Sequence, residues 1–134
     1  MVTREDIESF LDRLGSEGGG YQEVEPGLWV VKPGGQLDLD VVVHYLPPVV
    51  LFRVKVMSCP RSDGRDADLN RRLLELNATD LLHGSYGIDQ DAVVLTEALE
   101  LSHLDYEEFQ ATYESITLAL ASHLRELAAF REER

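Results

Sequence analysis

The stretch that decides the fold is residues 69–101, which read LNRRLLELNATDLLHGSYGIDQDAVVLTEALEL. Its first third predicts a helix, because leucines recur there at helical spacing and Asn77 is a suitable end: Leu69, Leu73, Leu76. Two runs of strand-forming residues follow, from Leu82 to Ile88 and from Ala92 to Leu101. The acidic segment 89–91 separates them as a turn. The stretch therefore predicts a helix followed by a β-hairpin.

Upstream of this stretch, three further runs predict strands at Leu28–Lys32, Leu37–Leu46 and Val49–Met57. Pro33-Gly34-Gly35 and Pro47-Pro48 separate them, and such residues break a strand and turn the chain. In the third run, valine and phenylalanine alternate with Arg53 and Lys55. This alternation is typical of a sheet that has one covered face.

The two ends of the chain predict amphipathic helices. Thr3 and Asp105 are suitable N-caps, and acidic residues follow each of them in the first turn. The resulting order is α-β-β-β-α-β-β-α, an α+β fold with an antiparallel sheet covered by helices. We expect the first and last helices to cover one face of the sheet. We expect the second helix to lie between its three-stranded and two-stranded portions.

Length and charge limit the function. The 134 residues fit a single domain over 1–134, and no apolar run approaches the roughly 20 residues of a membrane span. A net charge of −13 argues against nucleic acid as a partner, because phosphate backbones repel an acidic protein. The acidic N-terminal segment is unlike a signal peptide, and the single cysteine fits a reducing cytoplasm. We therefore expect a cytoplasmic protein that binds neither membrane nor nucleic acid.

One segment departs from this acidic character. Residues 53–72 hold three acidic residues and six basic ones: Arg53, Lys55, Arg61, Arg65, Arg71 and Arg72. An ordinary solvated loop and helix face is one interpretation of this segment. A local site for an acidic partner is the other.

No pattern in the chain predicts catalysis. His44, His83, His103 and His123 do not pair with one another or with Cys59 at metal-ligand spacing. Cys59 has no candidate base beside it in the sequence, as a catalytic nucleophile would require. We therefore predict no catalytic residue, no metal site and no cofactor.

The predicted order of elements resembles that of the type III secretion chaperones of the Tir-chaperone (CesT-type) class and the related YbjN family. The local resemblance is best over residues 69–101, with a leucine-rich helix, a glycine-containing strand, an acidic turn and a Val/Leu strand. It implies a small acidic bacterial α+β protein, usually a homodimer, that binds an extended segment of a partner polypeptide. Neither family supplies a catalytic residue to carry over.

Two hypotheses for the function follow. The first is a non-catalytic protein-binding module, chaperone-like or regulatory, that binds a segment of a partner polypeptide as a homodimer. Its candidates for the partner or dimer interface are Leu81, Leu82, Tyr86 and Ile88. The second is a small-molecule-binding or enzymatic domain that uses the basic segment Arg53–Arg72. The second requires Arg53, Lys55 and a histidine to converge in a closed polar pocket, whereas the first requires a symmetric apolar interface.

Overall fold

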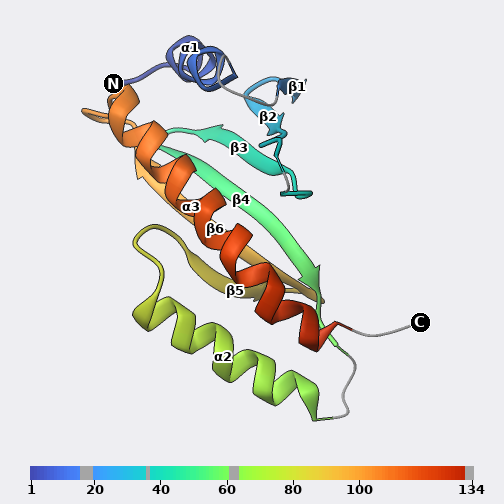
Figure 1. Cartoon of the computed structure of the whole chain (residues 1–134). Helices are drawn as coiled ribbons and strands as arrows, with labels where there is room; N and C mark the ends of the chain where they lie inside the picture. The colour runs from blue at the N-terminus through green and yellow to red at the C-terminus, as the bar shows by residue number, and fades with distance from the viewer. Residues whose placement is uncertain (16–19, 36, 61–63, 132–134) are drawn as a thin grey trace.

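The computed structural model describes residues 1–15, 20–35, 37–60 and 64–131 (Figure 1). Its elements are, in chain order, α1 (Arg4–Gly15), β1 (Tyr21–Glu25), β2 (Leu28–Val31), β3 (Val41–Leu46), β4 (Val49–Ser58), α2 (Arg65–Thr79), β5 (Ser85–Asp89), β6 (Ala92–Glu100), α3 (Tyr106–Leu127) and the short 3-10 helix η1 (Ala128–Phe130).

The six strands form one antiparallel sheet in the order β1-β2-β3-β4-β6-β5. The predicted fold class is confirmed, and the sheet has one strand more than predicted. This strand, β1, has the sequence YQEVE, whose single aliphatic residue gives no apolar alternation to detect. It pairs with β2 across a turn in which Gly27 has a φ of +77°, a conformation that glycine adopts at little cost.

Two predicted strands begin later than expected. Residues 37–40 lie outside β3, which starts at Val41, and β5 starts at Ser85 rather than at Leu82. Gly84 precedes β5 with a φ of +85°, and a Cβ there would lie 3.2 Å from the carbonyl oxygen of Thr96. The chain therefore turns closely against β6 at Gly84 before pairing begins.

The prediction that the second helix separates two portions of the sheet is wrong. β4 pairs directly with β6 over nine residue pairs, so the sheet is continuous. α2 follows β4 in the chain but lies beside β5, at the edge of the sheet (Figure 1). The β5–β6 hairpin is turned so that its second strand, not its first, joins β4.

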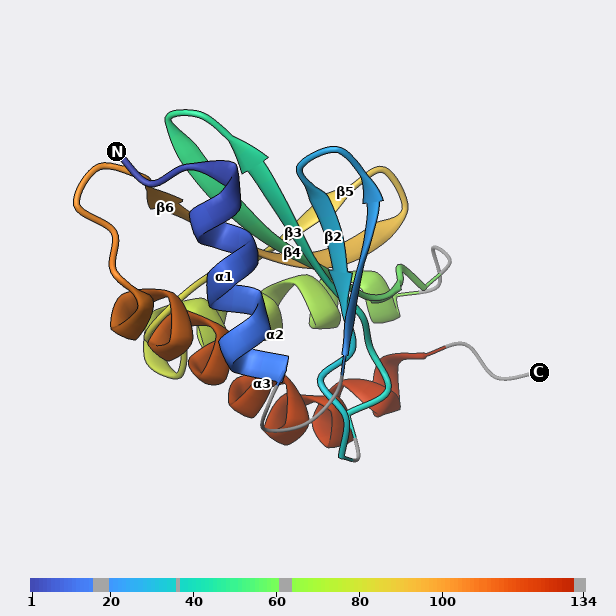
Figure 2. The same ribbon diagram turned by 90° about the horizontal axis from the view of Figure 1, so that it is seen from above.

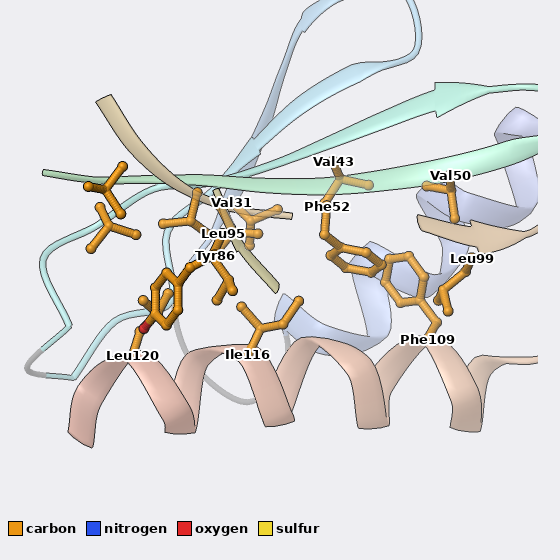
Figure 3. Packing of buried hydrophobic residues seen from close by; sticks show 14 of the residues in the cluster. Val31, Val43, Val50, Phe52, Tyr86, Leu95, Leu99, Phe109, Ile116 and Leu120 are labelled. Carbon is orange, nitrogen blue, oxygen red and sulfur yellow. The ribbon is translucent and has the colours of Figure 1, made fainter. Parts of the chain in front are cut away.

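All three helices pack on one face of the sheet, which we call the inner face (Figure 2). The prediction that the first and last helices cover one face is therefore confirmed. Phe109 of α3 lies between Phe52 of β4 and Phe10 of α1, with ring centroids 5.1 and 5.3 Å away. Ile116 and Leu120 extend the same contact surface of α3 towards the sheet (Figure 3). Burial of such side chains is the main source of stability in a domain of this size.

The opposite face of the sheet, here the outer face, has no helix over it in the part of the chain that the structure describes. The register places His44 beside Leu51 and Ala98, and Val42 beside Arg53 and Thr96, on this face. Most of these outward side chains are partly buried by one another, and Lys55 and Ala98 are exposed.

Candidate functional site

A shallow apolar groove of about 250 Å³ lies between α2 and the edge strand β5. We call it the α2–β5 groove, and it is lined by Asn70, Leu73, Leu74, Tyr86, Gly87 and Ile88. Leu73 and Tyr86 form part of the hydrophobic core, whereas Leu74 is 68% exposed and Ile88 is 50% exposed. Glycine at position 87 leaves the strand without a side chain there. The groove is therefore open and has a rim of large apolar side chains.

The connection between α2 and β5 adds to this apolar surface. Leu82 lies on that connection and is 89% exposed, the highest value among the large apolar residues that the structure describes. Large exposed apolar side chains that lie close together are typical of interaction sites rather than of an ordinary surface. The helix, the connection and the strand thus each supply one such residue: Leu74, Leu82, Ile88.

The free edge of β5 is partly closed by the side chain of Asn77. The backbone N–H of Tyr86 donates to Asn77 Oδ1 at 2.7 Å, and Asn77 Nδ2 donates to the carbonyl oxygen of Tyr86 at 3.2 Å. An amide side chain that makes both bonds imitates a neighbouring strand at that residue. Because alternate residues of an edge strand direct their backbone groups outward, Ile88 is the next outward position.

Consecutive polar contacts hold the inner side of the groove, where Tyr86 lies, against α3 and the end of α2. The hydroxyl of Tyr86 lies 2.7 Å from His123 Nδ1, and His123 Nε2 lies 3.2 Å from Asp80 Oδ2. His123 is 5% exposed, so this link joins β5, α3 and the end of α2 inside the protein. Burial raises the pKa of Tyr86 well above its ordinary value. The phenol therefore remains neutral and acts as a hydrogen-bonding group.

Charged groups hold α2 against α3 at the same place. Arg72 of α2 forms an ion pair with Glu126 of α3 and a second with Glu75 at 3.2 Å. The guanidinium of Arg72 lowers the pKa of Glu126. The hydroxyl of Thr79, followed by His123, lowers the pKa of Asp80. α2, which forms one wall of the groove, is therefore held against α3 by these contacts.

The four residues predicted to form the dimer face lie in different environments. Ile88 is exposed at the groove and Leu82 is exposed on the connection before β5. Leu81 is partly buried against the core, and Tyr86 is only 6% exposed. A substitution at Tyr86 would therefore disturb the core as well as the surface.

The six basic residues of segment 53–72 are not gathered in one site. Arg53 and Lys55 lie on the outer face, where Arg53 Nη2 is 2.5 Å from Asp89 Oδ2. Arg71 and Arg72 lie on α2 and pair with acidic side chains, Arg71 with Glu75 at 3.3 Å. Arg61 and the side chain of Arg65 lie outside the described residues. His44 shares the outer face with Arg53 and Lys55, but that face is open rather than a closed pocket.

Cys59 lies at the end of β4, where its backbone N–H donates to the carbonyl oxygen of Asp91 at 2.7 Å. Burial raises the pKa of its thiol, which disfavours the reactive thiolate. In residues 1–15, 20–35, 37–60 and 64–131, no three His, Cys, Asp or Glu side chains gather as metal ligands. Within the same ranges, no helix is long and apolar enough to cross a membrane.

The comparison with known families decides the affiliation of the chain. The family model CesT_Tir_1 matches residues 2–133. The chain belongs to the CesT_Tir_1 family. The predicted resemblance to CesT-type chaperones is therefore confirmed over nearly the whole chain. No curated protein sequence matches this one.

Solved structures share the fold of this CesT_Tir_1 member. A chain of the heterodimeric ExoU–SpcU complex from the type III secretion system of Pseudomonas aeruginosa is 15% identical with a TM-score of 0.66, over 89% of this chain and 95% of that one. YbjN from E. coli is 15% identical with a TM-score of 0.65, over 94% and 96%. The complex of the Yersinia pestis type III secretion chaperone SycH with a fragment of YscM2 contains a chain that is 13% identical with a TM-score of 0.55, over 85% and 96%.

Sequence reasoning did not identify Asn77, Asp80 or His123 as residues that support the groove of this CesT_Tir_1 member. The sequence could have indicated His123, because it occupies an inward position of the apolar stripe of α3 between Leu120 and Leu127. A histidine at such a position needs a polar partner inside the protein. Asn77 was expected only to end its helix, because its two bonds depend on how β5 lies beside α2.

Proposed function

We propose that residues 1–134 act as one chaperone-like domain in the cytoplasm, a non-catalytic homodimer that binds a segment of a partner polypeptide. In this proposal the two copies pack together through the α2–β5 groove. The rest of the apolar surface remains for the partner. The net charge of −13 keeps such a protein dispersed in spite of its apolar surface.

The observation that carries this proposal is the apolar rim of the groove. Leu74 and Ile88 line a hollow that has no occupant from the described chain, and each is at least half exposed; Leu82, on the connection that precedes β5, is exposed as well. A twofold axis through the groove would bury these side chains against their own counterparts, as a self-complementary interface requires. Asn77 already occupies the strand edge at Tyr86, so the contact would be made by side chains rather than by joining two sheets.

The fold supports the partner half of the proposal. The ExoU–SpcU structure is a heterodimeric complex, and SycH is a type III secretion chaperone solved with a fragment of YscM2. Both contain chains that share the fold of the present protein at low sequence identity. Binding of a segment of another polypeptide is therefore the function that we transfer to this chain.

Light scattering on the purified protein tests the dimer. We expect a mass of two chains of 15.1 kDa each at micromolar concentration, and a monomer for Leu74→Glu. A carboxylate at position 74 would be desolvated in the interface without a partner, which is costly. Leu118→Glu is the matched control, because Leu118 lies on α3 and is 74% exposed. A strictly monomeric wild type, or loss of the dimer in both variants, would contradict the assignment of the groove.

A pull-down from the native host, read by mass spectrometry, tests the partner. We expect one polypeptide to be retained in a fixed ratio to the dimer. Recovery of general unfolded proteins in variable amounts would contradict a dedicated partner.

A further inference from the structure

The outer face of the sheet carries many apolar side chains in the middle of the molecule. Outward positions of β2, β3, β4 and β6 hold aliphatic side chains that the register places in neighbouring rows: Leu28, Val30, Val42, Leu51, Val94, Ala98. At the β1–β2 end of this face lies a shallow hollow of about 300 Å³ that Val24 and Val30 help to line. Val24 is 49% exposed.

The alternation of a sheet exposed to water would place polar residues at these positions. Here the inner face is mainly apolar, with Glu23 and Glu97 as exceptions, and the outer face holds apolar residues at many positions as well. Strands that are apolar on both sides are typical of a sheet covered on both faces. The three helices cover only the inner face (Figure 2), so the second layer is missing from the described chain.

The central outward positions of β4 are basic, whereas the molecule as a whole is acidic. The chain has 25 acidic and 12 basic residues, yet β4 directs Arg53 and Lys55 outward two residues apart. Lys55 is exposed, and Arg53 forms an ion pair with Asp89. Two cations beside an apolar surface favour an occupant that is both apolar and acidic.

The occupant is not a second copy in a symmetric arrangement. A twofold contact between two outer faces would bring Arg53 and Lys55 of both copies together, and like charges oppose each other at short distance. A contact between this face and an acidic surface of another copy would be asymmetric and would not close. A different polypeptide avoids both difficulties.

Backbone hydrogen bonding decides the conformation of this occupant. β3, β4 and β6 have paired strands on both sides, so the centre of the outer face offers side chains and no free backbone groups. An extended segment lying there would leave its own N–H and C=O groups without partners, whereas a helix satisfies them internally. Helices on both faces of a sheet are also a common layer architecture.

We propose that the outer face of the sheet is a docking surface for an amphipathic α-helix of the partner polypeptide, with its apolar stripe on Val30, Val42 and Leu51 and acidic residues against Arg53 and Lys55. This inference rests on the proposed function, of which it specifies the partner. It assigns the outer face to the partner and leaves the α2–β5 groove to the second copy.

A designed peptide tests this inference without knowledge of the natural partner. The probe has about five helical turns, with leucines on one stripe and glutamates beside it; a second peptide has lysine in place of each glutamate. We expect the acidic peptide to bind the wild-type protein and to shift the NMR signals of β3, β4 and β6. We expect Lys55→Glu to weaken this binding roughly tenfold.

Arg71→Glu is the matched control, because it makes the same charge change at an 82% exposed side chain of α2, away from the outer face. We expect it to bind the acidic peptide within about twofold of the wild type. Equal weakening by Lys55→Glu and Arg71→Glu, absence of binding, or shifts confined to α2 and β5 would overturn the proposal. Dissociation of the dimer by Lys55→Glu would show that a second copy covers the face.

The two proposals fail separately. Light scattering reports the dimer through Leu74→Glu, and peptide titration reports the outer face through Lys55→Glu. A monomeric wild type that still binds the acidic peptide would remove the dimer and leave the docking surface. A dimer that binds neither peptide would leave the dimer proposal and remove the docking surface.

Discussion

The two edge strands of the sheet contact helices in different ways. At the β1 edge, Arg4 of α1 holds both carboxylate oxygens of Glu23 at 2.5 Å and lies over the ring of Trp29 at 5.5 Å. Tyr21 adds a hydrogen bond to Asp12 of the same helix. At the β5 edge, the neutral side chain of Asn77 makes the contact to the strand, and the apolar residues beside it remain exposed.

This difference indicates different roles. The β1 edge joins its helix through charged groups that water can also solvate, so the contact stabilises the fold without needing a partner. The β5 edge presents apolar side chains and an outward backbone position that only another protein surface would cover. The four predictions below test this contrast, in order of decreasing expected effect.

The largest effect is expected for Asn77→Ala at the β5 edge. The substitution removes both bonds to the backbone of Tyr86 and leaves a part-buried N–H and C=O without partners. We expect a loss of about 1–3 kcal/mol in the free energy of unfolding, measured by urea denaturation. Asn70→Ala, on the exposed side of the same groove, is the control, and an equal loss there would contradict the role of Asn77.

A smaller effect is expected for Tyr86→Phe. It removes the hydroxyl that contacts His123 Nδ1 and keeps the ring in the core. We expect a loss of about 1 kcal/mol, because one buried hydrogen bond is lost and the apolar packing is kept. Tyr113→Phe is the comparison on α3, since burial raises the pKa of Tyr113 to about 12. A stability equal to that of the wild type would show that the Tyr86–His123 contact is not formed in solution.

At the β1 edge, Glu23→Gln is expected to have a smaller effect still, and one that depends on salt. The ion pair with Arg4 is partly exposed, with side chains 30% and 27% accessible, so water and salt screen it. We expect the difference in urea midpoint between variant and wild type to shrink as salt rises to about 1 M. The difference in urea midpoint between Asn77→Ala and the wild type should persist at that salt concentration. A difference that shrinks for Asn77→Ala and persists for Glu23→Gln would contradict the contrast between the edges.

Acid is expected to loosen the β1 edge before the backbone contact at the β5 edge. The hydrogen bond from Arg4, followed by that from the N–H of Gly27, lowers the pKa of Glu23 below its ordinary value of 4.5. A carboxyl group whose folded pKa is lowered stabilises the fold above its unfolded pKa, and this stabilisation is lost as the pH falls through the folded pKa. The amide of Asn77 does not titrate.

Hydrogen exchange between about pH 6 and pH 3, corrected for intrinsic rates, measures this difference. We expect protection to fall in Tyr21–Glu25 more than at Tyr86, and Glu23→Gln to show little further loss. Equal loss at both edges would refute a separate contribution from Glu23.

The contrast between the edges also explains what the sequence could predict. Leucine and valine periodicity in residues 69–101 predicted α2 and the β5–β6 hairpin, because the residues that bury their side chains determine these elements. β1 was missed because its side chains pair with α1 through charges, and a sequence such as YQEVE has no apolar alternation. Of the residues predicted for the interface, Leu82 and Ile88 are exposed, whereas Tyr86 is buried and contacts His123, which lies 37 residues away.

The pairing of β4 with β6 has a consequence for synthesis of the protein on the ribosome. β4 is complete at Ser58, but its partner on one side is formed only when residues 92–100 have emerged. Until then the nascent chain presents the unpaired edge of β4, with Val50, Phe52 and Val54 uncovered by α3. Long-range strand pairing is slow, and open apolar edges aggregate. The incomplete chain therefore exposes an apolar strand edge that the completed fold covers. We expect chaperones that act on nascent chains to bind it at this stage.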